Sequence, residues 1–167
     1  MKLQILMAVF VANFAFAGQT NFSPVDINEY HKEEVLRESK GLAPRFAKIN
    51  KTKIDILNNQ NAFQAQSMTT FRHIISSKTS VSLNLAFENI KLSANSKLSI
   101  FSKDLSTKVI SFKAEDIKLS SLWTPVIESD ELVVELVTPT EEIALNNVVI
   151  SRVNQGFRKF SQSTLKS

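Results

Sequence analysis

The sequence predicts a mainly β protein, an antiparallel jelly-roll-like β-sandwich with one short N-terminal helix. From about Ile54 onward, apolar and polar residues alternate with the period of a strand that has one buried face. Turn-forming residues separate these runs at intervals of about 10–15 residues, without amphipathic helices between them. A chain of 167 residues, 43% of them hydrophobic, is long enough for one domain with a sizeable core.

The first segment has the pattern of a bacterial secretory signal peptide. Lys2 supplies a positive charge, Leu3 to Phe16 is mostly apolar, and Ala15-Phe16-Ala17 is an A-x-A cleavage site. The apolar run is shorter than the roughly 20 residues of a membrane-spanning helix. We therefore expect residues 1–17 to be removed. The mature chain would be secreted or periplasmic, with no stable membrane insertion after cleavage.

Residues 18–41 are predicted to form a polar leader with one surface helix. Ser23 is expected to cap the helix, Pro24 to occupy its first position and Gly41 to end it. Ile27, Tyr30 (or His31) and Val35 fall near helical spacing and predict a narrow apolar stripe. The side chains expected to face water are those of Glu33, Glu34, Arg37 and Glu38.

Residues 42–160 are predicted to form the β-sandwich, and residues 161–167 a polar C-terminal tail. The clearest strand covers 81–88, with alternate apolar residues at Val81, Leu83, Leu85 and Phe87. Further strands are expected around 98–101, 108–112, 132–137 and 148–153. In the strand at 132–137, Leu132, Val134 and Leu136 are expected to face the core. The opposite, solvated face is expected to carry Glu131, Val133, Glu135 and Val137.

Composition and charge exclude several classes of function. The chain has no Cys, which rules out disulfides, a thiol nucleophile, iron–sulfur clusters and Cys-based zinc sites. It has three Gly and no phosphate-binding loop motif. The net charge of +4 comes from two basic stretches, around 45–53 and 152–166, separated by an acidic block around 128–142. We interpret these stretches as solvated faces rather than a nucleic-acid site, and we expect no cofactor.

Few residues suit catalysis or metal binding. His31 and His73 are the two histidines, and no serine lies in a G-x-S-x-G context. We interpret His73 as a partly buried structural residue and His31 as solvent-facing. Glu131 and Glu135 would lie about 13 Å apart along a strand, too far for a retaining glycosidase pair. The acidic turn around 128–131 is a weak calcium candidate. We expect neither an enzyme nor a resident metal.

Six motifs in sequence order make residues from about 42 to 160 similar to the N-terminal accessory domain of secreted bacterial trypsin-like serine endopeptidases of the lysyl-endopeptidase type. The most specific stretch is 122–136, and the others are 42–47, 70–77, 82–87, 97–102 and 149–158. The chain departs from the family pattern at four positions. Phe71, Ser129, Gln155 and Phe157 stand where the family usually has Trp, Gly, His and Tyr.

The resemblance implies a non-catalytic domain, since in that family it precedes the protease without carrying the catalytic triad. We therefore expect an exported β-sandwich that binds a secreted trypsin-like serine protease as inhibitor, folding helper or targeting module. The contact would be an exposed edge strand or the basic tail from Arg158 to Ser167. Two alternatives stay open: an extracellular adhesion or carbohydrate-binding module, which the single Trp and Tyr disfavour, and the remnant of a split secreted protease.

The family motifs supply the candidate structural or binding residues. Trp123 is expected to be an aromatic plug at a strand entrance. Arg72 and Arg158 are expected to reach acidic strand faces such as Glu135 in charge-assisted pairs that fix strand order. The full set is Arg72, Trp123, Thr124, Pro125, Asp130, Glu131, Glu135, Gly156, Phe157 and Arg158.

Overall fold

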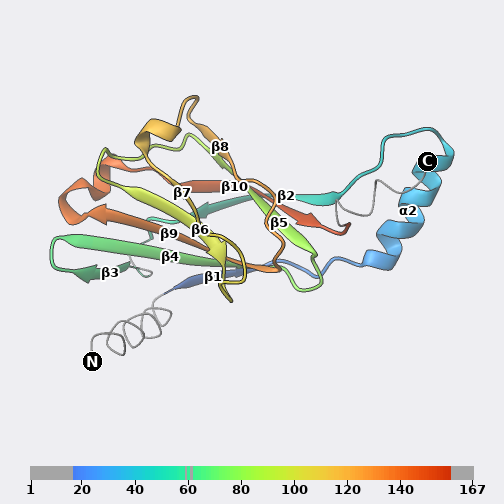
Figure 1. Ribbon diagram of the computed structural model, residues 1–167, viewed down its shortest axis with the longest axis horizontal. Helices are drawn as coiled ribbons and strands as arrows, with labels where there is room; N and C mark the ends of the chain where they lie inside the picture. The colour runs from blue at the N-terminus through green and yellow to red at the C-terminus, as the bar shows by residue number, and fades with distance from the viewer. Residues whose placement is uncertain (1–16, 59, 61, 159–167) are drawn as a thin grey trace.

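The computed structural model describes residues 17–58, 60 and 62–158. Within these ranges the chain forms two β-sheets, with helix α2 (Ile27–Ser39) at one end of the molecule (Figure 1). The prediction of a mainly β protein with a short N-terminal helix is confirmed. The predicted signal peptide and polar tail lie outside the described residues, apart from Ala17.

The larger sheet, sheet A, has the strand order β1-β4-β9-β6-β7, with β3 also paired to β4. Its strands are β1 (Gly18–Asn21), β3 (Ala62–Ala65), β4 (Met68–Ser76), β6 (Lys97–Ser102), β7 (Ile110–Phe112) and β9 (Glu131–Pro139). The pairing of β1 with β4 is parallel, and the other pairs in this sheet are antiparallel.

The smaller sheet, sheet B, has the order β2-β10-β5-β8 and is antiparallel. Its strands are β2 (Ala47–Asp55), β5 (Ser82–Glu88), β8 (Ser121–Trp123) and β10 (Val149–Gly156). The short 3-10 helices η3 (Ala114–Asp116) and η4 (Thr140–Leu145) lie in connections between strands.

The two sheets share one apolar core, because alternate residues of their strands point inward. The predicted alternation in 81–88 and 132–136 is confirmed on the inner faces. Wholly buried core residues are Phe71 and Ile75 on β4, Leu132 and Leu136 on β9, Leu83, Leu85 and Phe87 on β5, and Ile150 and Val153 on β10.

The outer face of sheet A is more buried than predicted. Val133, expected to face water with Glu131 and Glu135, is fully buried. It packs with Ile74 and Phe101 in a second apolar cluster, which Ala17 also contacts. The expectation was wrong at Val133 because cross-strand neighbours on this face are themselves apolar, and one strand's pattern cannot show that.

The start of the predicted leader is a strand rather than a loop. Residues 18–21 form β1, which pairs with β4 from Gly18 opposite His73 to Asn21 opposite Ser76. The segment carries no apolar alternation, so hydrophobic periodicity could not reveal it. Backbone pairing and the contact of Thr20 Oγ1 with His73 Nε2, at 2.8 Å, hold it in place.

Helix α2 begins three residues later than predicted. Asp26, not Ser23, is the N-cap, and its carboxylate accepts a hydrogen bond from the backbone N–H of Glu29 at 3.0 Å. Pro24 therefore precedes the helix. The predicted stop at Gly41 is confirmed, since Gly41 has a φ of +68° just after the C-cap Lys40.

The predicted apolar stripe of this helix is wrong at Val35, although Ile27 and Tyr30 are half-buried. Val35 is 69% exposed, whereas Glu34, expected to face water, is fully buried. The reason is an arginine contact described below. No helix in the described part of the chain is long and apolar enough to cross a membrane.

Candidate binding surface

The outer face of sheet B, called the sheet-B face below, is built from three rows of side chains that point away from the core. Paired residues on neighbouring strands project to the same side, so strand register defines each row. The rows are Ala47–Gly156–Ser82, Ile49–Asn154–Asn84 and Lys51–Arg152–Ala86–Trp123. Four strands therefore contribute to one surface.

Trp123 lies on this surface rather than inside the protein. It pairs with outward-facing Ala86, and it is 50% exposed, so the predicted aromatic plug is wrong. The guanidinium carbon of Arg152 lies 5.8 Å from the centre of the Trp123 ring. Arg152 Nη2 also lies 3.4 Å from Glu88 Oε1. The row thus ends in an aromatic side chain whose cation–π partner comes from β10.

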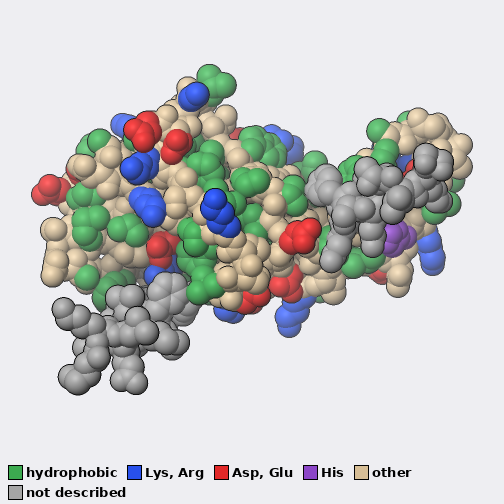
Figure 2. Space-filling view, viewed as in Figure 1, with side chains coloured by type: hydrophobic (Ala, Val, Ile, Leu, Met, Phe, Trp, Pro, Cys, Tyr) green, Lys and Arg blue, Asp and Glu red, His purple; other side chains and the backbone are tan. Residues whose placement is uncertain are grey.

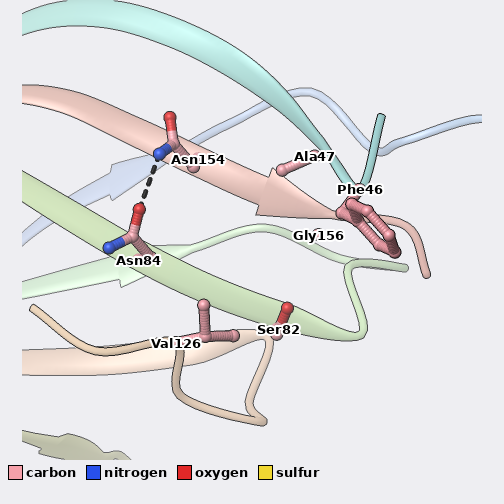
Figure 3. A pocket seen from close by; sticks show the side chains of 7 residues that line it. All are labelled: Phe46, Ala47, Ser82, Asn84, Val126, Asn154 and Gly156. Carbon is pink, nitrogen blue, oxygen red and sulfur yellow. Dashed lines mark hydrogen bonds between the residues drawn. The ribbon is translucent and has the colours of Figure 1, made fainter. Parts of the chain in front are cut away.

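A pocket of about 160 Å³ opens on the sheet-B face (Figure 3). An amide pair forms one end: Asn154 Nδ2 donates to Asn84 Oδ1, and Asn84 Nδ2 donates to the Thr124 carbonyl, both at 2.6 Å. Phe46 lies at the other end, as Figure 3 shows. The lining carries no charged side chain and consists of Phe46, Ala47, Ser82, Asn84, Val126, Asn154 and Gly156.

Strand β2 forms one margin of this surface. It pairs with β10, and no other described strand pairs with its opposite edge. Ile49 is 63% exposed, and Lys51 and Lys53 are exposed as well. A strand of nine residues with one open edge can add a further strand through its backbone N–H and C=O groups.

Helix α2 is fixed beside the start of β2 by Glu34 and Arg45. The Glu34 carboxylate accepts from the Arg45 backbone N–H at 2.7 Å and from Arg45 Nε at 2.6 Å. Arg45 Nη2 also contacts Glu33 at 2.5 Å. Burial raises the pKa of Glu34, but the hydrogen bonds and charge of Arg45 outweigh it and hold that pKa below its ordinary value. This contact explains the buried acid on α2.

The end of the last family motif also contacts α2. The Phe157 ring is buried and stacks on Tyr30, with ring centroids 4.6 Å apart. Arg158 Nη1 lies 3.3 Å from Glu38 Oε1. The expectation that Arg158 pairs with Glu135 was therefore wrong, because β10 ends beside α2 (Figure 1).

The Arg72–Glu135 pair is confirmed. Arg72 Nε lies 2.5 Å from Glu135 Oε2, and the two residues are direct partners on β4 and β9. Their side chains are 10% and 17% exposed, so the pair is largely removed from water. It lies on the outer face of sheet A, not on the sheet-B face.

The other motif residues are divided between the two sheets and have separate roles. Thr124 is buried, and its hydroxyl accepts from the Leu85 backbone N–H at 3.0 Å. Pro125 is exposed. The Asp130 carbonyl accepts from the Ser77 N–H at 2.8 Å, and Glu131 pairs with Lys103 at 3.2 Å. The motif set therefore marks fold contacts more than a single site.

Charged side chains of the described residues are spread over the surface. Figure 2 shows Lys and Arg side chains interspersed with Asp and Glu on the visible face. Within the described ranges, no group of three His, Asp or Glu residues is placed to hold a metal ion. His31 is exposed on α2, and His73 is buried against Thr20.

Burial makes His73 a determinant of acid stability. Burial lowers the pKa of His73 below its ordinary value of about 6.5. At lower pH the unfolded chain therefore binds a proton that the folded chain does not. We therefore expect the contribution of His73 to stability to be fully present above pH ~6.5 and to be lost as the pH drops toward the lowered pKa. Urea titrations at pH 7.5, 6.5 and 5.5 should show this fall.

The control variants separate His73 from the acidic groups. His73→Gln should reduce the loss of stability between pH 7.5 and 5.5, whatever its effect at a single pH. The matched variant His31→Gln, at an exposed position on α2, should leave the pH dependence unchanged. If the free energy of unfolding changed equally with pH in both variants, the assignment to His73 would be contradicted.

Gln155 joins three parts of the chain that lie far apart in sequence, and sequence analysis missed it. The fully buried Gln155 amide donates through Nε2 to the Ser23 carbonyl at 2.9 Å and to the Ser77 hydroxyl. Its Oε1 accepts from Asn50 Nδ2 at 2.7 Å. The one signal was its place at the family's histidine position. The structure shows that an uncharged group with donor and acceptor atoms holds the leader, β2 and the end of β4 together.

Removing this amide should destabilise the fold. We expect Gln155→Leu to cost about 1–2 kcal/mol, since buried partners of Gln155 lose a hydrogen bond. Chemical denaturation checks this, with Gln64→Leu on exposed β3 as the matched control. Gln155→His should retain part of the stability if an imidazole can serve the same partners. A Gln155→Leu variant as stable as Gln64→Leu would refute the role.

Compared with known protein families, the chain matches none, and a search of curated proteins finds no significant match either. The resemblance to the accessory domain of lysyl-endopeptidase-type proteases therefore stays a prediction.

Proposed function

We propose that this protein is a non-catalytic exported binding domain, a jelly-roll-like β-sandwich that binds a secreted trypsin-like serine protease through the open edge of β2. The observation that carries the proposal is β2 itself, an extended strand with exposed lysines and one edge that no described strand pairs with. The family resemblance supplies the choice of partner.

The geometry of β2 suits an inhibitor better than a folding helper or a targeting module. A trypsin-like protease with an acidic specificity pocket accepts a Lys side chain. Lys51 and Lys53 are presented on a strand whose other edge is held by seven register pairs with β10. Because the strand is already ordered, little conformational entropy is lost on binding. Lysines on an edge strand also oppose pairing between copies of the chain, so the two roles need separating by experiment.

The test uses the exported chain as purified, with a lysine-specific trypsin-like protease. We expect the chain to slow cleavage of a small lysyl substrate, and Lys51→Ala/Lys53→Ala to weaken this inhibition about tenfold or more. Lys91→Ala/Lys118→Ala, which changes two exposed lysines outside β2, is the matched control. If the native chain neither binds nor slows the protease, the proposal fails. If the Lys51→Ala/Lys53→Ala variant aggregates but still inhibits the protease as the native chain does, the two lysines only prevent pairing between copies of the chain.

A carbohydrate-binding role is the second candidate, and one observation favours it. Trp123 is half-exposed on the same surface as the Asn84–Asn154 amide pair, and an aromatic ring with nearby amides suits sugar recognition. A polysaccharide pull-down with the native chain and Trp123→Ala distinguishes the two functions. Retention that depends on Trp123 but not on Lys51 would favour the glycan.

A further inference from the structure

The sheet-B face carries an ordered series of features along the direction of its strands. Trp123 and Arg152 lie in one row, the Asn84–Asn154 amide pair lies in the next row, and the pocket reaches the row after that, around Gly156. We infer that a neutral oligosaccharide binds along this series, with its terminal sugar in the pocket and a further sugar against Trp123. The inference rests on the carbohydrate-binding candidate above, and it adds the order of the subsites and the charge of the ligand.

The spacing of the rows suits a short glycan. Alternate residues of a strand are about 6.6 Å apart, so the surface from Arg152 past Asn154 to Gly156 on β10 is about 13 Å long. Trp123, 50% exposed, marks one end, and Val126, 45% exposed, lies in the pocket lining at the other (Figure 3). A chain of a few sugar rings can therefore contact the aromatic ring and the pocket at the same time.

The pocket lining divides into an apolar and a polar part. Phe46, Ala47 and Val126 are apolar, and Ser82 Oγ lies over Gly156, 2.1 Å from the position that a Cβ there would take. A sugar ring is divided in the same way, with C–H groups on its faces and hydroxyls at its edge, and a few polar groups in such a pocket fix the orientation of the ligand. The lining has no charged side chain, so a charged group would lose hydration without a counterion.

The hydrogen bonds of the asparagine pair leave one acceptor of the lining without a donor. The Thr124 carbonyl can only accept, so the bond from Asn84 Nδ2 at 2.6 Å fixes the orientation of the Asn84 amide. Asn84 Oδ1 then accepts from Asn154 Nδ2, also at 2.6 Å, which turns Asn154 Oδ1 away from Asn84. No described residue donates to this oxygen. A sugar hydroxyl carries the donor that is missing, whereas an apolar group does not.

The volume of the pocket limits it to one sugar. It holds about 160 Å³, close to the engineered cavity of about 150 Å³ that takes up benzene. Further sugars of the same chain must therefore lie outside it, over the asparagine pair and Trp123. The Arg152 guanidinium carbon, 5.8 Å from the centre of the Trp123 ring, restrains that ring before any ligand binds, so stacking on it costs little side-chain entropy.

The test is an NMR titration of the native chain with three neutral trisaccharides, cellotriose, maltotriose and triacetylchitotriose, and with the acidic trisaccharide trigalacturonate. We expect saturable shifts of the Ser82, Asn154 and Gly156 backbone amides and of the Trp123 indole N–H with at least one neutral trisaccharide. Trigalacturonate should bind about tenfold more weakly or worse, because the pocket offers it no counterion. No saturable shift with any neutral trisaccharide, or equally tight binding of trigalacturonate, would overturn the inference.

Variants assign the two ends of the surface. Asn154→Ala and Ser82→Ala should each weaken trisaccharide binding, the first by about tenfold, because each removes a polar group from the pocket. Ser82→Ala removes a single oxygen atom, so it keeps the test valid if Asn154→Ala does not fold. Asn21→Ala, at an exposed position on β1 of sheet A, is the matched control. Trp123→Ala should also cost about tenfold, and Trp123→Phe less. Equal binding by the two pocket variants and the control would refute the pocket subsite.

These outcomes separate the pocket from the two proposed functions. Shifts confined to Trp123 would support the carbohydrate-binding candidate and refute the pocket subsite. No binding in the titration and no retention in the pull-down would refute both. Lys51→Ala/Lys53→Ala should keep trisaccharide binding, since neither residue lines the pocket, and loss of binding in this variant would contradict the placement of the glycan. Protease inhibition, measured on the same variants, tests the protease proposal alone.

Discussion

Replacing Gly156 by alanine is expected to lower the free energy of unfolding by about 2–3 kcal/mol. An added Cβ would lie 2.1 Å from Ser82 Oγ and 3.3 Å from Ser82 Cβ, on the neighbouring strand β5. Gly156 does not have a positive φ, so the backbone itself would accept alanine. The cost comes from overpacking between two paired strands, because the buried Ser82 hydroxyl must leave its position and the Ser82 carbonyl oxygen and Cβ stay in tight contact at 3.2 and 3.3 Å.

A double-mutant cycle tests this collision. Chemical denaturation should show that Ser82→Ala, by removing Oγ, recovers about half of the loss caused by Gly156→Ala. Gly41→Ala is the control, because Gly41 has a positive φ and nothing lies within 4 Å of an added Cβ. Gly41→Ala should cost about 1 kcal/mol through backbone strain, and this cost should be the same with and without Ser82→Ala. An unchanged stability for Gly156→Ala would contradict the prediction.

The strands that sequence analysis located are those in which apolar residues alternate and the apolar face is buried. Strand β5 follows this rule, with Leu83, Leu85 and Phe87 inside, and the inward positions of β9 do as well. The weakest signals belonged to short or peripheral strands. Strand β1 is stabilised by pairing with β4, and β2 has one buried apolar side chain, Ile54, so alternation of hydrophobicity was faint or absent in both.

The candidate surface was less predictable because it depends on contacts between distant segments. Glu34 is buried only because Arg45, eleven residues later, supplies both a backbone N–H and a guanidinium. Gln155 gains its role from partners on three separate segments. The pocket requires β2, β10 and β5 to be neighbours, and strand order is not encoded in any local pattern. The Arg72–Glu135 pair was predicted because its two residues carry opposite charges and stand in two motifs of the family resemblance, at 70–77 and 122–136.

Breaking that pair should have the largest effect of any substitution considered. We expect Arg72→Met to cost about 3 kcal/mol, since Glu135 would keep a charge in a position that is 17% exposed, without the guanidinium 2.5 Å away. Arg72→Met combined with Glu135→Leu should regain most of this loss, because two apolar side chains can replace the pair beside the apolar cluster of Ile74 and Val133.

The matched control is an exposed ion pair on the same face. Lys103 and Glu131, whose side chains are 41% and 32% exposed, lie 3.2 Å apart between β9 and the end of β6. Lys103→Met should change stability by less than about 1 kcal/mol, because water screens this pair. If urea denaturation gives similar losses for Arg72→Met and Lys103→Met, burial does not set the energy of the Arg72–Glu135 contact. A double variant no more stable than Arg72→Met would show instead that the arginine stabilises the sheet through its packing rather than its charge.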